Sequence, residues 1–171
     1  MSAEEIYQQH NSGALYSDIQ HHLPTLRNFA HGNVFEIGVR SGVSTAALLL
    51  GVRENGGHVW SLDIGECGFL YADDPNWTFI HGHSIEDSAR ILAALPRPLD
   101  LLFIDSDHAY QITSDELHLY APLVKSGGII LMHDVDLEGA GVRRALEEYA
   151  AEIGKTPSYA SGSYGLGVLV P

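Results

Sequence analysis

Short apolar runs alternate with longer segments of helical periodicity along most of the chain. The apolar runs are rich in β-branched and aliphatic residues and cover residues 34–37, 58–62, 77–81, 99–104 and 128–132. The segments between or after them repeat Leu, Ile, Val and Ala at helical spacing over residues 44–52, 84–95, 114–124 and 138–153. This order predicts an α/β fold with parallel strands joined by helical crossovers, and nearly continuous apolar strands indicate a sheet covered on both faces.

The two ends of the chain depart from this alternation. A Gly/Ser/Tyr-rich stretch at 158–165 precedes a last apolar run at 166–170, which predicts a closing hairpin with an antiparallel strand. Residues 14–29 predict one or two helical turns, interrupted by Pro24, that cover a sheet face or frame a site. Gly127 and Gly128 are expected to end a helix before the fifth strand.

Composition and charge restrict the size of the fold and its partners. The chain has 171 residues, 45% of them hydrophobic, which suits one domain with a core. Its net charge of −13, with nine Lys and Arg, argues against nucleic acid as a partner. Neither a bilayer-spanning apolar run nor a signal-type start is visible, so we expect no membrane partner and a cytoplasmic protein. The single cysteine, Cys67, cannot form an internal disulfide, and we interpret it as incidental.

Acidic residues stand at the ends of four predicted strands. They are Glu36, Asp63, Asp105 and Asp134, the last preceded by His133. Ligands of open parallel sheets collect at the carboxyl ends of the strands, where these side chains would meet. Any one acid could simply cap the following helix or turn. Four together favour a site for a cationic ligand, a metal ion, or both.

The most specific motif is VFEIGVRSGVST at residues 34–45, between the first strand and the next helix. Its glycines allow close approach of the backbone to a ligand, and Ser44 or Thr45 offers a hydroxyl in the first helical turn. A dinucleotide fingerprint needs further glycines where Arg40 and Val43 stand, and a phosphate-binding P-loop needs a lysine. An oxidoreductase on a similar sheet is thereby disfavoured, although it stays an alternative, as does a cofactor-binding domain without turnover.

The chain resembles the class I S-adenosylmethionine-dependent methyltransferases from Gly32 to Val170. Glu36-x-Gly38-x-x-x-Gly42 is similar to the first motif of that family, Asp63 falls where its ribose-binding acid belongs, and His81-Gly82-His83-Ser84 resembles the segment beside the adenine. The resemblance implies a single domain over 1–171, with a helical cap at 1–32 and a cofactor-binding core at 33–171. It also implies a Rossmann-like, seven-stranded, mostly parallel sheet with an antiparallel C-terminal strand and helices on both faces. The implied cofactor-binding residues are Glu36, Gly38, Arg40, Ser41, Gly42, Ser44, Asp63, Ile64, Gly82, His83, Ser84 and Asp105.

Two further segments, 100–110 and 127–135, resemble the metal-dependent small-molecule O-methyltransferases of the catechol and caffeoyl-CoA type and their bacterial sugar and macrolide relatives. By position, the implied metal ligands are Asp105, His133 and Asp134. His133 replaces a carboxylate of the commoner pattern; it either ligates, shifting preference from Mg²⁺ toward Mn²⁺, Fe²⁺ or Zn²⁺, or does not ligate at all. His108 stands where the catechol-type enzymes carry a catalytic lysine, so it is either a general base or a cap of the helix near Tyr110.

The expected activity is methyl transfer from S-adenosylmethionine to a hydroxyl of a small molecule, assisted by a divalent metal, Mg²⁺ or Mn²⁺. Asp105 and His108 are the expected catalytic residues, while N- or C-methylation stays an alternative. No pattern in the sequence identifies the acceptor molecule. Aromatic residues of the loops are candidates for its pocket, namely Tyr16, Phe69, Tyr71, Tyr110 and Tyr164. Because the chain is short, a homo-oligomer that completes the pocket is a further alternative.

Overall fold

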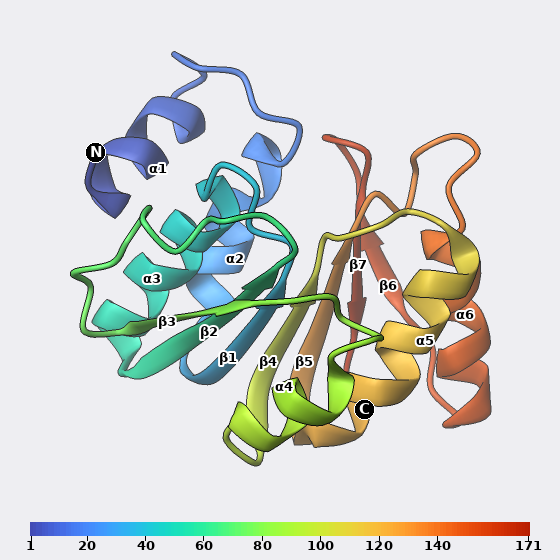
Figure 1. Cartoon of the computed structure of the whole chain (residues 1–171). Coiled ribbons are helices and arrows are strands. Elements are labelled where there is room, and N and C mark those ends of the chain that lie inside the picture. Colours follow the sequence, from blue (N-terminus) through green and yellow to red (C-terminus); the bar gives the residue numbers. More distant parts are fainter.

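The computed structural model describes residues 1–171 and contains one seven-stranded sheet in the order β3-β2-β1-β4-β5-β7-β6 (Figure 1). The strands are β1 (Gly32–Ile37), β2 (Gly57–Asp63), β3 (Trp77–His81), β4 (Leu99–Ile104), β5 (Val124–His133), β6 (Ser158–Ala160) and β7 (Leu166–Leu169). The first five pair in parallel, β7 is antiparallel to β5, and β6 is antiparallel to β7. The predicted Rossmann-like sheet with an antiparallel C-terminal strand is confirmed.

Helices cover both faces of this sheet, as the apolar strands predict. One face carries α1 (Ala3–Asn11), α2 (Leu23–Phe29) and α3 (Val43–Asn55), and the other carries α4 (Ser88–Ala94), α5 (Tyr110–Tyr120) and α6 (Val142–Glu152). Two 3₁₀ turns, η1 (Gln20–His22) and η2 (Ala121–Leu123), flank α2 and α5. None of these helices is long and apolar enough to cross a membrane.

Successive strand residues point to opposite faces and so build two separate cores. In β1, Val34 packs with the α1–α3 layer and Phe35 with the α4–α6 layer, and Leu101 and Leu102 of β4 divide in the same way. Each core contains 22 buried residues, so the sheet is covered equally on both sides. This equal burial explains why the strands show no polar face in the sequence.

Three local features differ from what the sequence pattern predicts, because tertiary packing determines the structure there. The mostly polar segment of α1 was not predicted, although Ser2 and Glu5 form a capping box there and three of its residues are buried. Pro24 lies in the first turn of α2, where it is compatible with a helix, so it does not interrupt one. Gly127 and Gly128 lie inside β5, beside a register shift against β4, and do not end a helix. The division into a cap at 1–32 and a core at 33–171 stays a prediction.

The register of the central strands brings their carboxyl ends to one edge. Ile37 of β1 lies opposite Leu62 of β2 and Ile104 of β4, and Ile104 in turn lies opposite Met132 of β5. The residues that follow these positions therefore meet at that edge. They are Gly38, Asp63, Asp105 and His133.

Candidate functional site

Two neighbouring cavities open at the carboxyl edge of the sheet. The first, here the His108 cavity, has a volume of about 420 Å³, and the second, the Asp63 cavity, about 350 Å³. Of the predicted site residues, the His108 cavity is lined by Gly38, Arg40, Ser41, Ser44, Asp105, His108 and Asp134. The Asp63 cavity is lined by Gly38, Arg40, Asp63, Ile64, Gly82, His83, Ser84 and Asp105. Glu36, Gly42 and His133 line neither cavity, and Gly38, Arg40, Asp105 and Ser106 line both.

The loop from β1 to α3 lies between the two cavities, and its path depends on an unusual backbone conformation. Gly38 has φ 97° and lies against the end of β4, where a Cβ would overlap the carbonyl oxygen of Asp105. The next turn places Arg40 at φ 52° and ends on Gly42, the N-cap of α3. Because glycine has no Cβ, the loop can pass directly over the strand ends at position 38, where no other residue fits.

Asp63 fixes this loop from the end of β2. Its Oδ2 accepts hydrogen bonds from the backbone N–H groups of Val39 at 2.7 Å and Arg40 at 2.9 Å, and its Oδ1 accepts from Gly65 at 2.7 Å. A carboxylate offers about four acceptor positions, so Asp63 can hold the loop and still accept from a ligand hydroxyl. The predicted ribose contact is therefore compatible with the structure.

Glu36 supports the loop from inside the protein. It is fully buried, and its carboxylate accepts from the hydroxyls of Ser44 at 2.7 Å, Thr45 at 2.8 Å and Ser61 at 2.6 Å. Burial raises the pKa of Glu36 to about 7 although the three hydroxyls oppose that rise. The structure thus places Glu36 where it ties β1 to α3 and β2, behind the wall of the His108 cavity.

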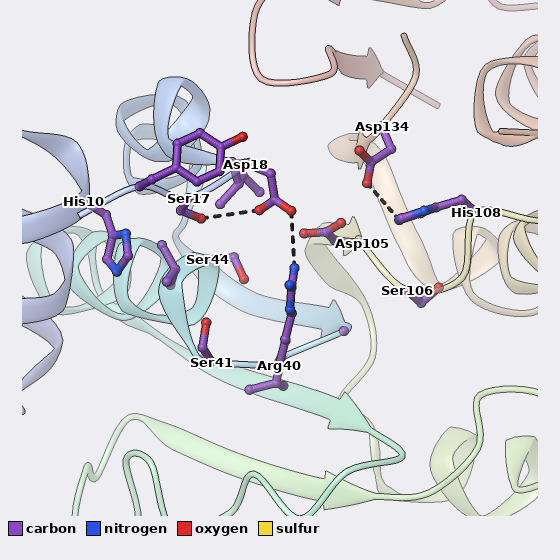
Figure 2. Close-up of a pocket in the computed structure, with 15 residues that line it drawn as sticks. His10, Ser17, Asp18, Arg40, Ser41, Ser44, Asp105, Ser106, His108 and Asp134 are labelled. Carbon is purple, nitrogen blue, oxygen red and sulfur yellow. Dashed lines mark hydrogen bonds and ion pairs between the residues drawn. The ribbon is translucent and has the colours of Figure 1, made fainter. Parts of the chain in front are cut away.

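A cluster of two acids and a histidine lies in the His108 cavity. One ligand atom each from Asp105, His108 and Asp134 lies within 4.8 Å of the others. His108 Nε2 is 2.9 Å from Oδ2 of Asp134, and Figure 2 shows the imidazole turned toward that carboxylate. The side chain of Asp134 is 7% exposed, against 44% for His108, so a buried carboxylate orients a solvent-facing imidazole. Burial opposes the charge of Asp134, but His133 and His108 together lower its pKa.

His133 lies behind the acids and faces both of them. Its Nδ1 is 3.2 Å from Oδ1 of Asp105 and 3.0 Å from Oδ2 of Asp134, while its Nε2 is 2.6 Å from the carbonyl oxygen of Ser163. Because a carbonyl only accepts, Nε2 carries a proton. Burial lowers the pKa of His133, but the two carboxylates outweigh it and raise the value to about 10. His133 is thus a buried cation between the two carboxylates. At the cavity, His108 contacts Asp134 and lies near Asp105.

Several lining residues were missed in the sequence. His10 of α1 and Asp18 line the His108 cavity, and Asp18 forms an ion pair with Arg40 at 3.2 Å (Figure 2). Ile112 and Glu116 of α5 line the Asp63 cavity. None of the four ends a strand, so the rule that located the acids could not find them.

The aromatic candidates for the acceptor pocket are dispersed. Tyr16 lines the His108 cavity. Phe69 and Tyr71 line a third cavity of about 540 Å³ beside Met1, and the Tyr71 hydroxyl donates to the carbonyl oxygen of Gly42 at 2.7 Å. Tyr110 and Tyr164 line none of the three cavities.

Solved structures of methyltransferases share this fold. The O-methyltransferase from Bacillus cereus in complex with SAH is 19% identical, with a TM-score of 0.68 over 99% of this chain and 90% of that one. The SAH-bound methyltransferase PaMTH1 from Podospora anserina is 17% identical, with a TM-score of 0.69 over 98% and 86%. The MycE methyltransferase of the mycinamycin pathway, in complex with Mg, SAH and mycinamycin VI, is 15% identical, with a TM-score of 0.69 over 99% and 54%.

Sequence comparison gives one curated relative and one family. An uncharacterized protein, R132 of Acanthamoeba polyphaga mimivirus, is 38% identical over 64 residues, which are 32% of this chain and 29% of that protein. The chain therefore spans less than a third of the length of this relative. A family described as a methyltransferase domain matches residues 35–135, from β1 to the end of the acidic cluster. Since this match covers more than half of the sequence, the chain belongs to the methyltransferase-domain family.

Proposed function

We propose that the protein transfers a methyl group from S-adenosylmethionine to a hydroxyl of a small-molecule acceptor, with a divalent cation at Asp105 and Asp134. The observation that carries this proposal is that two cavities meet at Gly38 and Asp105, with the acid–histidine cluster in one of them. Such a pair of cavities suits a donor and an acceptor that must exchange one carbon at their junction. The family supplies the reaction class, and the SAH in several structural neighbours supports the donor.

The Asp63 cavity suits the donor. Its apolar walls include Leu62, Ile64 and Ile112, which fit the faces of a purine, and Asp63 offers carboxylate oxygens to the two ribose hydroxyls. Asp105 lies where this cavity meets the next one. A carboxylate at that junction favours the positively charged sulfonium.

The residues of the His108 cavity fit a divalent cation. Asp105 and Asp134 provide two carboxylates, and the side chain of Asp105 is 22% exposed. His133 faces both acids from the buried side and no Lys or Arg side chain forms an ion pair with either, so the cavity side of the two carboxylates is left for the cation. Two carboxylates suit Mg²⁺ or Mn²⁺, and an imidazole ligand beside them shifts the preference toward Mn²⁺, Fe²⁺ or Zn²⁺. A cation bound there supplies Lewis acidity, which lowers the pKa of a hydroxyl nearby.

The chain itself positions the reactants and accepts the proton. The S–CH₃ bond of the donor breaks, its electron pair returns to sulfur, and the acceptor oxygen forms the new C–O bond. His108 Nδ1 takes the hydroxyl proton, while the Nε2–H group donates to the buried carboxylate of Asp134, 2.9 Å away, which stabilises the resulting imidazolium. Holding the two reactants in line contributes most of the acceleration, on the order of 7–11 kcal/mol in well-oriented systems.

The distances within the cluster also favour a second role for His108, as the third metal ligand beside Asp105 and Asp134. Metal binding at Nε2 would replace the N–H group that donates to Asp134, so His108 cannot be the metal ligand and the oriented base at the same time. Metal affinity separates them. Replacement of a ligand weakens metal binding, whereas replacement of a base leaves it unchanged.

The test is a methyl-transfer assay with isotopically labelled S-adenosylmethionine and a panel of hydroxylated acceptors, combined with calorimetric titration of S-adenosylhomocysteine. We expect micromolar to millimolar binding, typical of enzyme substrates, and label transfer that chelation abolishes and Mg²⁺ or Mn²⁺ restores. Binding of a nicotinamide dinucleotide in place of S-adenosylhomocysteine would instead support the oxidoreductase alternative. Methylation of a nitrogen or carbon acceptor would overturn the assignment of the hydroxyl.

A further inference from the structure

The Asp63 cavity contains one acidic side chain that the proposed mechanism does not use. Glu116 lies in α5 and lines this cavity together with His83 and Ser84. Its exposed fraction is 0%, which is unusual for a glutamate because burial of a carboxyl group is costly unless it has partners. Burial raises the pKa of Glu116, and the hydroxyls of Ser106 and Ser84 oppose that rise.

The two oxygens of this carboxyl group are unequally partnered. Oε2 accepts a hydrogen bond from the hydroxyl of Ser106 at 2.6 Å. Oε1 is buried and has no hydrogen-bond partner in the protein. A buried acceptor without a donor destabilises a fold, so its retention calls for an explanation such as a ligand or a bound water.

The neighbouring polar groups of the cavity do not supply that donor. Asp107 accepts from the backbone N–H of Ala109 at 2.6 Å, and His83 Nδ1 accepts from that of Ile85 at 3.2 Å. Asp107 is itself an acceptor, and neither Nε2 of His83 nor the hydroxyl of Ser84 forms a hydrogen bond with Oε1. The donor for Oε1 is therefore left to a ligand in the cavity or to a bound water.

We propose that Oε1 of Glu116 accepts a hydrogen bond from the exocyclic amino group of the donor's adenine and so makes the site selective for adenine. This inference rests on the proposed donor. With the ribose at Asp63 and the base between the side chains of Ile64 and Ile112, the amino group is the donor that a purine offers to a buried acceptor. An inosine base carries a carbonyl at the same position, so it would bring a second acceptor against Oε1. Sites built around a buried hydrogen bond discriminate strongly against a ligand that cannot form it.

The experiment compares S-adenosylhomocysteine with S-inosylhomocysteine by calorimetric titration of the whole chain. We expect the wild type to bind the adenosyl compound at least about tenfold more tightly, the size of one unpaired buried acceptor. Glu116→Met removes the acceptor and is expected to bring the two affinities within about threefold of each other. Glu116→Gln keeps the shape and adds an amide donor, so it should lower the preference by strengthening inosyl binding. A general loss of folding would weaken the binding of both compounds together, so the ratio of the two affinities still reports on the role of Glu116.

Asp115→Asn is the matched control. Asp115 is the preceding residue of α5, accepts from the side chain of Gln111 at 2.9 Å and does not line the cavity, so this variant should keep the wild-type preference. A wild type that binds both compounds equally, or a Glu116→Gln variant with the full preference for adenine, would overturn the inference and assign Oε1 to a bound water. Failure of the wild type to bind either compound would contradict the proposed donor itself, which is a separate result.

Discussion

His108 lies in the loop between β4 and α5 and Asp134 in the loop between β5 and α6, yet Nε2 of His108 is 2.9 Å from Oδ2 of Asp134. The acid is buried and the imidazole faces the cavity, an arrangement that orients a base and stabilises its protonated form. Asp134→Asn keeps the shape and removes the charge. We expect kcat to fall about 100-fold, in the range that general-base assistance contributes, with little change in the affinity for S-adenosylhomocysteine.

Steady-state kinetics measures kcat of the Asp134→Asn variant, and calorimetry measures its affinity for S-adenosylhomocysteine. Asp136→Asn is the control, because Asp136 pairs with Arg143 and lies outside both cavities. Equal losses of turnover in the two variants would show that the His108–Asp134 contact has no part in the reaction.

The role of His108 can be separated from that of the metal. If His108 is the base, His108→Ala lowers turnover by about 100-fold or more while the affinity for Mn²⁺ is unchanged. If it is the third ligand, the same variant also weakens Mn²⁺ binding. Metal titration followed by paramagnetic resonance makes this measurement. Turnover that survives both chelation and His108→Ala would contradict the metal-and-base mechanism altogether.

Asp63 is expected to contribute to donor affinity both directly and through the loop that it holds. Asp63→Ala removes the acceptor for the ribose and for the N–H groups of Val39 and Arg40, so S-adenosylhomocysteine should bind at least about tenfold more weakly. Asp73→Ala, an exposed acid of the β2–β3 connection beside the third cavity, is the control. Unchanged affinity in Asp63→Ala would place the donor elsewhere.

Glu36 should impose a pH dependence on stability. Its pKa is about 7 in the folded protein and near 4.5 when unfolded, so between these values the folded state binds more protons. The free energy of unfolding therefore decreases as pH rises from about 4.5 to about 7, by up to about 3 kcal/mol for this group. Glu36→Gln should lack that decrease. Urea unfolding of both proteins at pH 5 and pH 8 gives the comparison, and identical pH slopes would contradict the prediction.

The ion pair between Asp18 and Arg40 connects the N-terminal segment to the loop between the cavities. The side chain of Arg40 is 85% exposed, so Asp18→Asn should change the free energy of unfolding by less than about 1 kcal/mol. Because Asp18 lines the His108 cavity, the same variant should raise KM for the acceptor and leave donor affinity unchanged. A change confined to donor affinity would assign Asp18 to the other cavity.

The sequence predicted those parts of the site that the topology places by rule. Parallel strands end at one edge, so the positions of Gly38, Asp63, Asp105 and Asp134 after their strands are enough to predict that they lie close together. Glu36 follows the same rule, yet its side chain turns into the core, because alternation along β1 points it at the hydroxyls of α3 and β2.

The rest depends on contacts between segments distant in the chain. Asp18 and His10 reach the His108 cavity because α1 and α2 pack on α3, and the three buried positions of α1 are too few for a strong helical pattern. Glu116 occupies an inward position of α5 that would suit a leucine equally well, so periodicity alone gives no reason to select it. Side-chain positions were required to see that His108 lies beside the acids at the cavity and that His133 lies behind them, while the assignment of His133 as a metal ligand stays a prediction.

The hydrogen bond from His133 to the carbonyl oxygen of Ser163 makes the acidic cluster depend on the β6–β7 hairpin. During synthesis, the loop between β1 and α3 emerges long before residue 163, whereas the imidazole that braces both carboxylates acquires its anchor only afterwards. A chain that stops before residue 163 would thus leave the imidazole of His133 without its carbonyl partner, and the carboxylates of Asp105 and Asp134 beside an imidazole that nothing orients from behind.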